Sequence, residues 1–397
     1  MIKYESWDTF DFSNLSDQKI KSILLEQNIP LSVEETKIVQ NEFLNRPPTL
    51  TELVLFSIQG SEHSSYKSSK EHIKHFVTDG PNVILGAKDD AGVVSLSVDN
   101  KGNRYGLVVS HESHNHPSQI VPYEGAATGI GGNVRDVCCM GAEVMALGDS
   151  LRFGSVDRNK TKWIHDGVVS GIAGYGNPLG IPNVCGDLYF DEEYSENCLV
   201  TVLTAGVVKE KSVIRSRSPK NSEGYDLILI GKPTDNSGFG GASFASLELE
   251  EEKKQQNKGA VQEPNAFLER HILKSTYALF EELEADGLIE KVGFKDLGAG
   301  GVACASIELA DAAGLGAEVW VDKVHTSMPK LDSHVILCSE TQERFMWACP
   351  PEITPKILDH YNKKFDFPNV STGAQASLVG KIIKEPHYTV YSGDKKL

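Results

Sequence analysis

The sequence predicts two domains of α/β or α+β type behind a small helical N-terminal segment. Single hydrophobic cores stop growing well below a length of 397 residues, so one core cannot account for this chain. Short β-type runs alternate loosely with helical patterns in both halves, and this alternation favours layers of helices on sheets. Hydrophobic residues make up 40% and charged residues 24% of the chain, which excludes a disordered chain or a coiled-coil rod.

Residues 1–58 are expected to form the helical segment or linker. Apolar residues recur at helix spacing within 33–44, Arg46-Pro-Pro breaks the pattern, and a further helix opens at Thr51. Residues 59–215 are expected to form the first domain, because apolar runs at 83–85, 93–98, 107–109 and 198–208 are separated by Gly and Asp/Asn turns. The glycine-rich stretch 125–133 is predicted to be a turn before a helix.

Residues 222–385 are expected to form the second domain. A buried strand is predicted at 226–231, and the glycine turn 238–241 in front of a helix is a candidate phosphate cradle. A long helix is predicted over 265–286 and strands over 335–338 and, as the last strand, 377–382. The charged run 248–258 is expected to be a mobile surface loop.

The charge balance and the cysteines restrict the function classes. Lys+Arg number 39 and Asp+Glu 55, a net charge of −16, which argues against binding to nucleic acid or to an anionic membrane. The seven cysteines include no CxxC pair, and the N-terminus lacks a basic region followed by an apolar stretch, so neither a disulfide framework nor a signal peptide is predicted. We therefore expect a reduced, cytoplasmic protein.

The densest polar motif is Ser-His-Glu-Ser-His-Asn-His-Pro at 110–117, directly after a predicted strand. Its groups are poor core material, because each would need a buried partner. A solvated turn and a zinc site of His114, His116 and Glu112 are two interpretations. A hard-metal site, with Glu112 on Mg²⁺ and a histidine as acid or base, is the third. We favour the third, because zinc hydrolases place two histidines at i, i+4 on a helix, which Pro117 forbids here.

Other segments also have a structural and a functional interpretation. Arg135 and Asp136 form either an ion pair or a phosphate-binding fork beside a metal ligand. Residues 296–303 match the dinucleotide pattern GxGxxA, but an Asp directly before the glycines favours a metal or phosphate loop. His63 is a helix C-terminal cap or a site residue. Residues 339–344 are a capping box at a helix start or a ligand loop.

Several of these segments resemble, in order, the motifs of the phosphoribosylformylglycinamidine synthase (PurL) family, the large synthetase subunits of purine biosynthesis. They are Gly60-Ser-Glu-His-Ser-Ser-Tyr-Lys, Glu112-Ser-His-Asn-His-Pro-Ser, Gly131-Gly-Asn-Val-Arg-Asp, Ser150-Leu-Arg-Phe-Gly, Gly171-Ile-Ala-Gly-Tyr-Gly-Asn-Pro-Leu-Gly-Ile-Pro, Asp296-Leu-Gly-Ala-Gly-Gly and Ser339-Glu-Thr-Gln-Glu-Arg. The resemblance spans about residues 40–385. It implies a PurM-like (aminoimidazole ribonucleotide synthetase-like) N-terminal domain, whose sheet forms a barrel on dimerisation, and a PurM-like C-terminal α+β domain.

The resemblance also implies an ATP-dependent ligase. In that family the amide oxygen of formylglycinamide ribonucleotide attacks the γ-phosphate of ATP, and ammonia from a glutaminase then displaces phosphate to form the amidine. Phosphoryl transfer depends mainly on positioning and on neutralising charge, so Mg²⁺ ligands and fixed donors are what it needs. An alternative is a non-catalytic half that holds the ribonucleotide as a scaffold.

The family's site residues fall on the matching motif positions. His63 and His114 take active-site positions, with His114 as proton acceptor, and Tyr66 takes an ATP-binding position. The magnesium positions fall on Glu112, Asp136 and Asp296. The substrate-binding positions fall on Ser113, His114, Asn115, His116, Arg135, Gln262, Glu340, Thr341 and Gln342.

Three departures from the family pattern stand out. Ser64 replaces the usual cysteine, and Ser110 replaces a basic residue expected to contact ATP. The family repeats its two-domain unit within one chain, whereas the motifs here account for the first copy. The resemblance therefore implies that the chain works with a second-half synthetase chain or as a self-dimer, together with a glutaminase subunit and a small bridging subunit.

Overall fold

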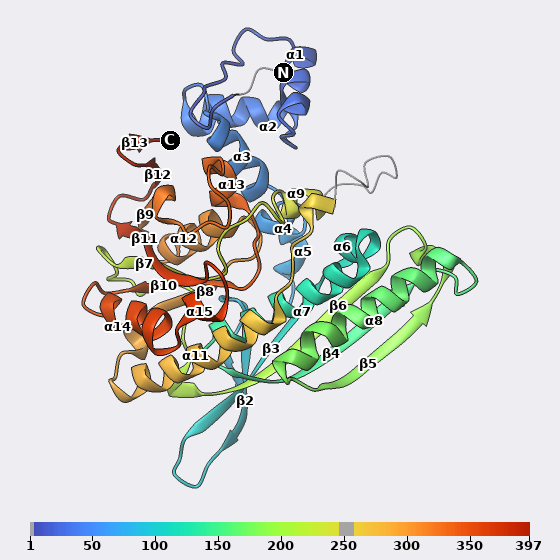
Figure 1. Ribbon diagram of the computed structural model, residues 1–397, viewed down its shortest axis with the longest axis vertical. Coiled ribbons are helices and arrows are strands. Elements are labelled where there is room, and N and C mark those ends of the chain that lie inside the picture. Colours follow the sequence, from blue (N-terminus) through green and yellow to red (C-terminus); the bar gives the residue numbers. More distant parts are fainter. Residues whose placement is uncertain (1–3, 246–257) are drawn as a thin grey trace.

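Two β-sheets organise the computed structural model, which describes residues 4–245 and 258–397 (Figure 1). The first sheet has the order β1-β2-β3-β6-β4-β5, with β4 and β5 parallel and the other neighbours antiparallel. Its strands are β1 (Val83–Leu85), β2 (Gly92–Val98), β3 (Arg104–Ser113), β4 (Glu143–Phe153), β5 (Asn183–Phe190) and β6 (Leu199–Lys209).

The second sheet has the order β13-β12-β9-β11-β7-β10-β8 and is antiparallel except where β12 pairs with β9. Every residue of β7 and β10 is buried, as expected for central strands covered on both faces. The strands are β7 (Asp226–Gly231), β8 (Gly293–Asp296), β9 (Gly316–Trp320), β10 (Arg344–Cys349), β11 (Gln375–Ile383), β12 (Tyr388–Ser392) and β13 (Lys395–Lys396). Mixed sheets with helices confirm the predicted fold class.

The N-terminal segment is helical, as predicted, and it packs against the second sheet. It contains α1 (Asp17–Glu26), α2 (Val33–Ile38), the π-helix η1 (Val39–Leu44) and α3 (Leu50–Gln59). Ser32 and Thr49 start α2 and α3 with capping boxes, which satisfy the free N–H groups of the first turn. Leu53 and Ile58 of α3 share a core with Leu229 of β7.

Helices α7 (Pro122–Cys139) and α8 (Asn159–Leu179) lie across one face of the first sheet (Figure 1). Burial alternates residue by residue along β6, with Val200 and Val202 buried toward these helices and Leu203 only half-buried on the other face. The edge strand β5 is exposed over its whole length. Within the part of the chain that the structure describes, helices therefore cover one face of the first sheet.

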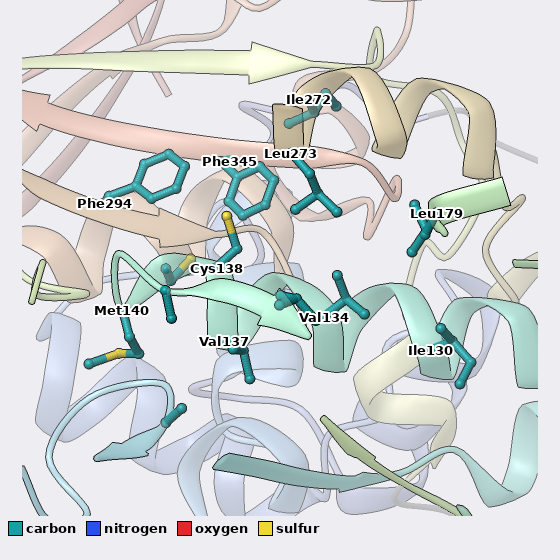
Figure 2. Packing of buried hydrophobic residues seen from close by; sticks show 14 of the residues in the cluster. Ile130, Val134, Val137, Cys138, Met140, Leu179, Ile272, Leu273, Phe294 and Phe345 are labelled. Atoms are coloured by element: carbon teal, nitrogen blue, oxygen red, sulfur yellow. The ribbon is translucent and has the colours of Figure 1, made fainter. Parts of the chain in front are cut away.

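A shared core joins the two halves, as Figure 2 shows. Ile130, Val134 and Cys138 of α7 meet residues from α11 (Ala266–Ala285) and the second sheet, including Leu273 and Phe345, within one buried cluster. Aromatic rings of β8 and β10 stack in it, with the Phe294 and Phe345 centroids 4.9 Å apart. This core holds α7 against the strands that carry the second half of the site.

The remaining helices and helical turns are α4 (Glu62–Ser65), α5 (Lys70–Ile73), α6 (Asn115–Ile120), η2 (Glu192–Tyr194), η3 (Glu210–Ser212), α9 (Gly241–Ala245), η5 (Lys258–Ala260), η6 (Ile289–Lys291), α12 (Gly301–Asp311), η7 (Val321–Lys323), α13 (Ser333–Cys338), α14 (Thr354–Asp359), η8 (His360–Lys364) and α15 (Phe367–Val370).

The glycine-rich stretch 125–133 is helical, so the predicted turn is wrong. All of it lies within α7. A Cβ on Gly125 would lie 2.4 Å from the backbone nitrogen of Ser118, and a Cβ on Gly131 would lie 2.7 Å from the Tyr175 hydroxyl. These glycines therefore permit close packing of α6 and α8 on α7. The expectation that Pro117 forbids a helix is also wrong, because Pro117 lies in the first turn of α6, where its missing N–H has no partner to lose.

The strand predicted at 335–338 and the capping-box interpretation of 339–344 are wrong as well, whereas the ligand-loop interpretation of 339–344 stays a prediction. Residues 335–338 belong to α13, and the polar run after them leads into strand β10 rather than capping a helix. Ile336 and Leu337 of α13 are buried, and so short an apolar run does not distinguish a buried strand from a buried helix turn. The sheets also include β4, β5, β9, β10, β12 and β13, which were not predicted, so 377–382 is not the last strand.

The other predicted elements were found. Strands occur at or around 83–85, 93–98, 107–109, 198–208 and 226–231, and the long helix α11 lies within 265–286. The predicted surface loop at 248–258 falls, apart from Lys258, outside the described residues. Within residues 4–245 and 258–397, none of the helices combines the length and apolar character needed to span a bilayer.

Candidate active site

A cleft of about 620 Å³ collects polar side chains from both halves of the chain. From the first half it is lined by the end of β3, by α6 and by α7, and from the second half by the end of β8, by α12 and by residues 340 and 342. The cleft is lined by His63, Tyr66, Glu112, Ser113, His114, Asn115, His116, Arg135, Asp136, Gln262, Asp296, Glu340 and Gln342 among the predicted site residues.

Strand β3 and helix α6 place the motif 110–117 at the cleft. β3 pairs with β6 as far as Ser113, opposite Thr201, so Glu112 belongs to the last residue pair but one of these two strands. The Asn115 side chain accepts a hydrogen bond from the backbone N–H of Val200 at 2.8 Å. This bond anchors the start of α6 to the neighbouring strand.

His114 lies between α6 and α7 with its imidazole in a defined tautomer. Nδ1 lies 2.5 Å from the carbonyl oxygen of Gly125, and since a carbonyl only accepts, Nδ1 carries the hydrogen and Nε2 is free to accept a proton. Burial lowers the pKa of His114 to about 4, although the bond to Gly125 opposes that change. Gly129 makes room for the ring, because a Cβ there would lie 3.0 Å from the His114 Cβ.

The three predicted metal carboxylates belong to different elements and influence one another electrostatically. Glu112 ends β3, Asp136 lies on α7, and Asp296 ends β8. Burial raises the pKa of Asp136 well above its usual range, and the charges of Asp296 and Glu112 add to that rise. Burial also raises the pKa of Glu112, with a further contribution from Asp296. Carboxylates gathered in this way are stabilised by a cation.

Ser110 supports Asp136 from inside the fold. Its hydroxyl donates to Asp136 Oδ2 at 3.0 Å and accepts from Asn133 Nδ2 at 2.8 Å. Besides Arg135, the cleft is lined by the basic side chains of Lys88, Arg217 and Lys295.

Arg135 forms its ion pair with Asp296 instead of Asp136. The Arg135 Nε lies 3.7 Å from Asp296 Oδ2, and the arginine side chain is 1% exposed. The sequence interpretation of an Arg135–Asp136 pair was therefore wrong in its partner. This contact bridges α7 and β8, and so it connects the two halves at the cleft.

Asp296 opens the turn between β8 and α12, where Gly300 and Gly301 adopt left-handed φ angles of 77° and 55°. β8 pairs antiparallel with β10 and is a sheet edge, so it does not provide the parallel βαβ unit that a dinucleotide fingerprint requires. The loop interpretation of residues 296–303 is the one that fits this geometry.

Lys295, Asp90 and Glu308 are cleft residues that the sequence reasoning missed. Lys295 Nζ lies 2.5 Å from Asp90 Oδ1 and 2.8 Å from Glu308 Oε2. Burial raises the pKa of Asp90 to about 7 against the attraction of Lys295. Asp90, Cys139 and Asp296 place possible ligand atoms within 4.8 Å of one another. The adjacent acids at 89 and 90, just before β2, were the available signal.

Glu340 organises the opposite wall of the cleft. Its carboxylate accepts from the backbone N–H of Ala242 at 2.7 Å and from Gln262 Nε2 at 2.8 Å. Burial raises the pKa of Glu340 to about 7. The N–H of Ala242, directly after the predicted phosphate cradle 238–241, is thus bonded to a carboxylate.

Thr341 is the predicted site residue that does not line the cleft. Its hydroxyl donates to Asp235 Oδ1 at 2.8 Å, and it is fully buried. Side chains alternate in direction along an extended segment, so Glu340 and Gln342 face the cleft while Thr341 faces inward.

His63 and Tyr66 border the cleft from α4. Burial lowers the pKa of His63, and the charge of His116 lowers it further. Tyr66 adopts a left-handed φ of 51°, which is uncommon for a bulky residue. Glu62 holds this turn by accepting hydrogen bonds from the backbone N–H groups and the hydroxyls of Ser68 and Ser69.

Family models match most of the chain. The formylglycinamide ribonucleotide amidotransferase linker domain matches residues 20–67. The N-terminal and C-terminal domains of AIR synthase related proteins match residues 88–208 and 222–393. The chain belongs to the AIR synthase related family. Within this family its resemblance to PurL is confirmed by the relatives described next.

The PurL relatives cover nearly the whole chain. The PurL subunit of phosphoribosylformylglycinamidine synthase from Methanothrix thermoacetophila is 46% identical over 382 residues, which are 95% of this chain and 49% of that protein. The chain thus spans about half the length of the curated relatives it matches.

Solved PurL structures share the fold of this chain. T. maritima PurL complexed with FGAR has a TM-score of 0.77 at 34% identity and covers 92% of this chain and 55% of its own. The same protein complexed with ATP has a TM-score of 0.74 at 32% identity, over 92% and 53%. PurLQS from Thermotoga maritima has a TM-score of 0.72 at 33% identity, over 92% and 53%.

Proposed function

We propose that this chain provides one half of an ATP-dependent formylglycinamide ribonucleotide amidotransferase, which converts the ribonucleotide, ATP and ammonia to the amidine, ADP and phosphate in purine biosynthesis. The observation that carries the proposal is the cleft, which gathers from both halves every predicted site residue except Thr341. PurL relatives complexed with FGAR and with ATP support both substrates. The free cysteines fit a reducing cytoplasm.

The residues present fit a magnesium ion. Glu112, Asp136 and Asp296 offer carboxylate oxygens, which Mg²⁺ prefers, and their mutual repulsion raises the pKa of Glu112 and Asp136 beyond the effect of burial. A bound Mg²⁺ would neutralise charge on the ATP phosphates.

The roles of the chain's own residues follow from the cleft. Arg135, Gln262, Glu340 and Gln342 bind and orient the ribonucleotide, so that its amide oxygen faces the γ-phosphorus of ATP. The new O–P bond forms as the bond to ADP breaks. His114 Nε2 accepts the proton lost by the amide nitrogen, since its tautomer and low pKa leave that nitrogen unprotonated. Ammonia then attacks the imidate carbon, and phosphate leaves.

We also infer that a second copy or a second-half synthetase chain covers the open face of the first sheet. Tyr189 of β5 and Val94 of β2 are exposed on the face opposite α7 and α8, and Leu203 and Val207 are half-buried there. A relative solved as PurLQS supports a glutaminase and a small subunit as further partners.

The test is ADP release from ATP with Mg²⁺, the ribonucleotide and an ammonium salt. We expect release that depends on the ribonucleotide once a second-half protein is added. A chain that never supports such release, yet binds the ribonucleotide in calorimetry, would be a scaffold. A chain that binds neither substrate in either assembly would refute the proposal.

A further inference from the structure

Two side chains of the cleft lie on a short segment that belongs to neither a helix nor a strand. Residues 339–343 connect the end of α13 to the start of β10, and all five are buried. Glu340 and Gln342 of this segment line the cleft. A buried backbone carbonyl requires a hydrogen-bond partner, and these residues lie outside the hydrogen-bond ladders that would provide one. The partners must therefore come from side chains.

Arg344, the first residue of β10, supplies such partners with its guanidinium. Its Nη2 donates to the carbonyl oxygen of Ser339 at 2.6 Å, and its Nε donates to the carbonyl oxygen of Thr341 at 2.8 Å. Its Nη1 donates to the hydroxyl of Thr234 at 2.8 Å. Because the planar guanidinium holds its donors in a rigid fork, it fixes the backbone on both sides of Glu340.

Thr234 connects this guanidinium to backbone that lies behind the cleft. Its N–H donates to the carbonyl oxygen of His325 at 2.9 Å, and its own carbonyl accepts from the N–H of Ser327 at 2.9 Å. None of these three residues lines the cleft. The segment 339–341 is thus attached, through Arg344, to a part of the second half that does not contact the substrates.

Thr341 attaches the same segment to its surroundings on the inner side. Its hydroxyl donates to Asp235 Oδ1 at 2.8 Å and accepts from the Asp235 backbone N–H at 3.1 Å. Neighbouring side chains of an extended segment point in opposite directions. With Thr341 held inward, the side chains of Glu340 and Gln342 are therefore directed into the cleft.

The burial of Arg344 is costly, which indicates that its hydrogen bonds serve a purpose beyond filling the core. The side chain is fully buried, and its three acceptors are neutral oxygens. Hydrogen bonds to neutral oxygens offset only part of the free energy needed to bury a cation, and an apolar side chain fills such a space at a lower cost. What an apolar side chain would not provide is the orientation of the two carbonyls.

We propose that Arg344 is a positioning residue, which holds the backbone of residues 339–341 so that Glu340 and Gln342 meet the ribonucleotide. The proposal rests on the proposed function, because those two side chains are taken there to bind the ribonucleotide. It also makes Thr341 an anchor of this segment instead of a residue that contacts the substrate.

The affinities for the two substrates test the proposal. The chain, alone or with the second-half protein, is titrated in a calorimeter with formylglycinamide ribonucleotide and, separately, with ATP and Mg²⁺. Arg344→Lys keeps the charge but loses the planar fork, so we expect the ribonucleotide to bind about tenfold more weakly and the affinity for ATP to stay the same. Thr234→Val removes one acceptor of the fork and should weaken ribonucleotide binding about threefold.

Phe367→Leu is the matched control for a protein that is merely less stable. Phe367 of α15 is fully buried and does not line the cleft. Its replacement should lower the melting temperature through loss of core packing and leave both affinities unchanged. In the reconstituted enzyme, Arg344→Lys should raise KM for the ribonucleotide more than it lowers kcat.

The results separate the positioning role from the proposed function. If the unmodified chain binds no ribonucleotide in either assembly, the proposed function fails and the positioning role fails with it. If the unmodified chain binds the ribonucleotide but Arg344→Lys binds it equally well, or loses affinity for both substrates to the same degree, the positioning role is refuted and the proposed function stands. If Arg344→Lys does not fold, Thr234→Val decides: a loss confined to the ribonucleotide supports the role, and unchanged affinity refutes it.

Discussion

At the scale of single residues, the imidazole of His114 has surroundings that suit it to accept a proton. The carbonyl of Gly125 sets its tautomer, and burial lowers its pKa to about 4. A neutral imidazole at pH 7 needs no prior deprotonation. Helix α7, through the carbonyl of Gly125, thus provides the surroundings that keep the His114 imidazole neutral and in one tautomer.

Replacing His114 should strongly lower turnover without unfolding the protein. We expect His114→Ala to lower kcat by about 10²-fold or more in the reconstituted enzyme, the range of general acid–base catalysis. The matched control is His72→Ala, at an exposed position on α5. Turnover near that of the unmodified enzyme would remove His114 from the mechanism.

The pH profile offers a second check on His114. Its pKa in the folded chain, about 4, is below the ordinary histidine pKa of 6.5, so folding keeps the ring neutral. Its contribution to stability is present above pH 6.5 and is lost as the pH falls toward 4. We expect the acidic limb of kcat that belongs to this group near pH 4, and a limb near 6.5 that disappears in His114→Ala would contradict the burial argument.

Asp136 should determine how much magnesium the enzyme needs. Asp136→Asn removes one anionic ligand from a site shared with Glu112 and Asp296, so the Mg²⁺ concentration for half-maximal rate should rise about tenfold or more. The exposed Asp157→Asn provides a control of the same chemistry. Equal Mg²⁺ dependence in both variants would remove Asp136 from the ligand set.

At the scale of elements, helix α7 connects the parts of the site. It carries Arg135 and Asp136, packs against α6 near His114, and contributes to the core shared with α11. Its glycines matter because they let neighbouring backbone approach. Gly125 meets the backbone of α6, which cannot move aside as a flexible side chain could.

Adding a methyl group at Gly125 should therefore be costly. The Cβ of Gly125→Ala would lie 2.4 Å from the Ser118 nitrogen, so we expect a loss of about 1–3 kcal/mol in the free energy of unfolding. Gly132→Ala is the matched control, because its Cβ meets nothing closer than 3.7 Å and alanine favours helix by about 1 kcal/mol. Similar melting temperatures for the two variants would contradict this packing argument.

The motif residues could be predicted better than the elements that carry them. His114, Asp136 and Asp296 were found because polar groups in apolar surroundings are conspicuous in a sequence. The helical glycines of α7 were mistaken for a turn, since glycine permits a turn and close packing alike. Lys295 and Asp90 were missed because their importance arises from an ion pair across 205 residues.

At the scale of the whole molecule, residues 4–245 and 258–397 leave one face of the first sheet uncovered. β5 is exposed along its length, and contiguous apolar surface of this kind marks an interaction site. The second sheet, in contrast, has helices on both faces and buried central strands. We therefore expect the chain to associate with a partner through the first sheet.

A charge on that face should weaken association. In sedimentation equilibrium we expect the chain to self-associate or to bind a second-half protein, and Val94→Glu to raise the dissociation constant about tenfold, since a charge would be buried unpaired. Val94 of β2 lies opposite Leu107 on that face and is 39% exposed, so the melting temperature of the chain alone should not change. Leu25→Glu on α1, 70% exposed, is the control. A monomer with no affinity for a second-half protein would refute the interface.

The sequence by itself predicted the fold class, and all but one of the site residues predicted from it line the cleft. Apolar periodicity and turn residues can be recognised within a short stretch of sequence. Motif residues keep their spacing in the sequence whatever the surrounding fold. Only the tertiary structure decided that Arg135 pairs with Asp296, that Thr341 faces away from the cleft and that Lys295 pairs with Asp90. Those facts depend on how the helices and strands of the two halves pack together. Packing brings together residues that lie far apart in the sequence, and nothing in the local sequence around either residue indicates that they meet.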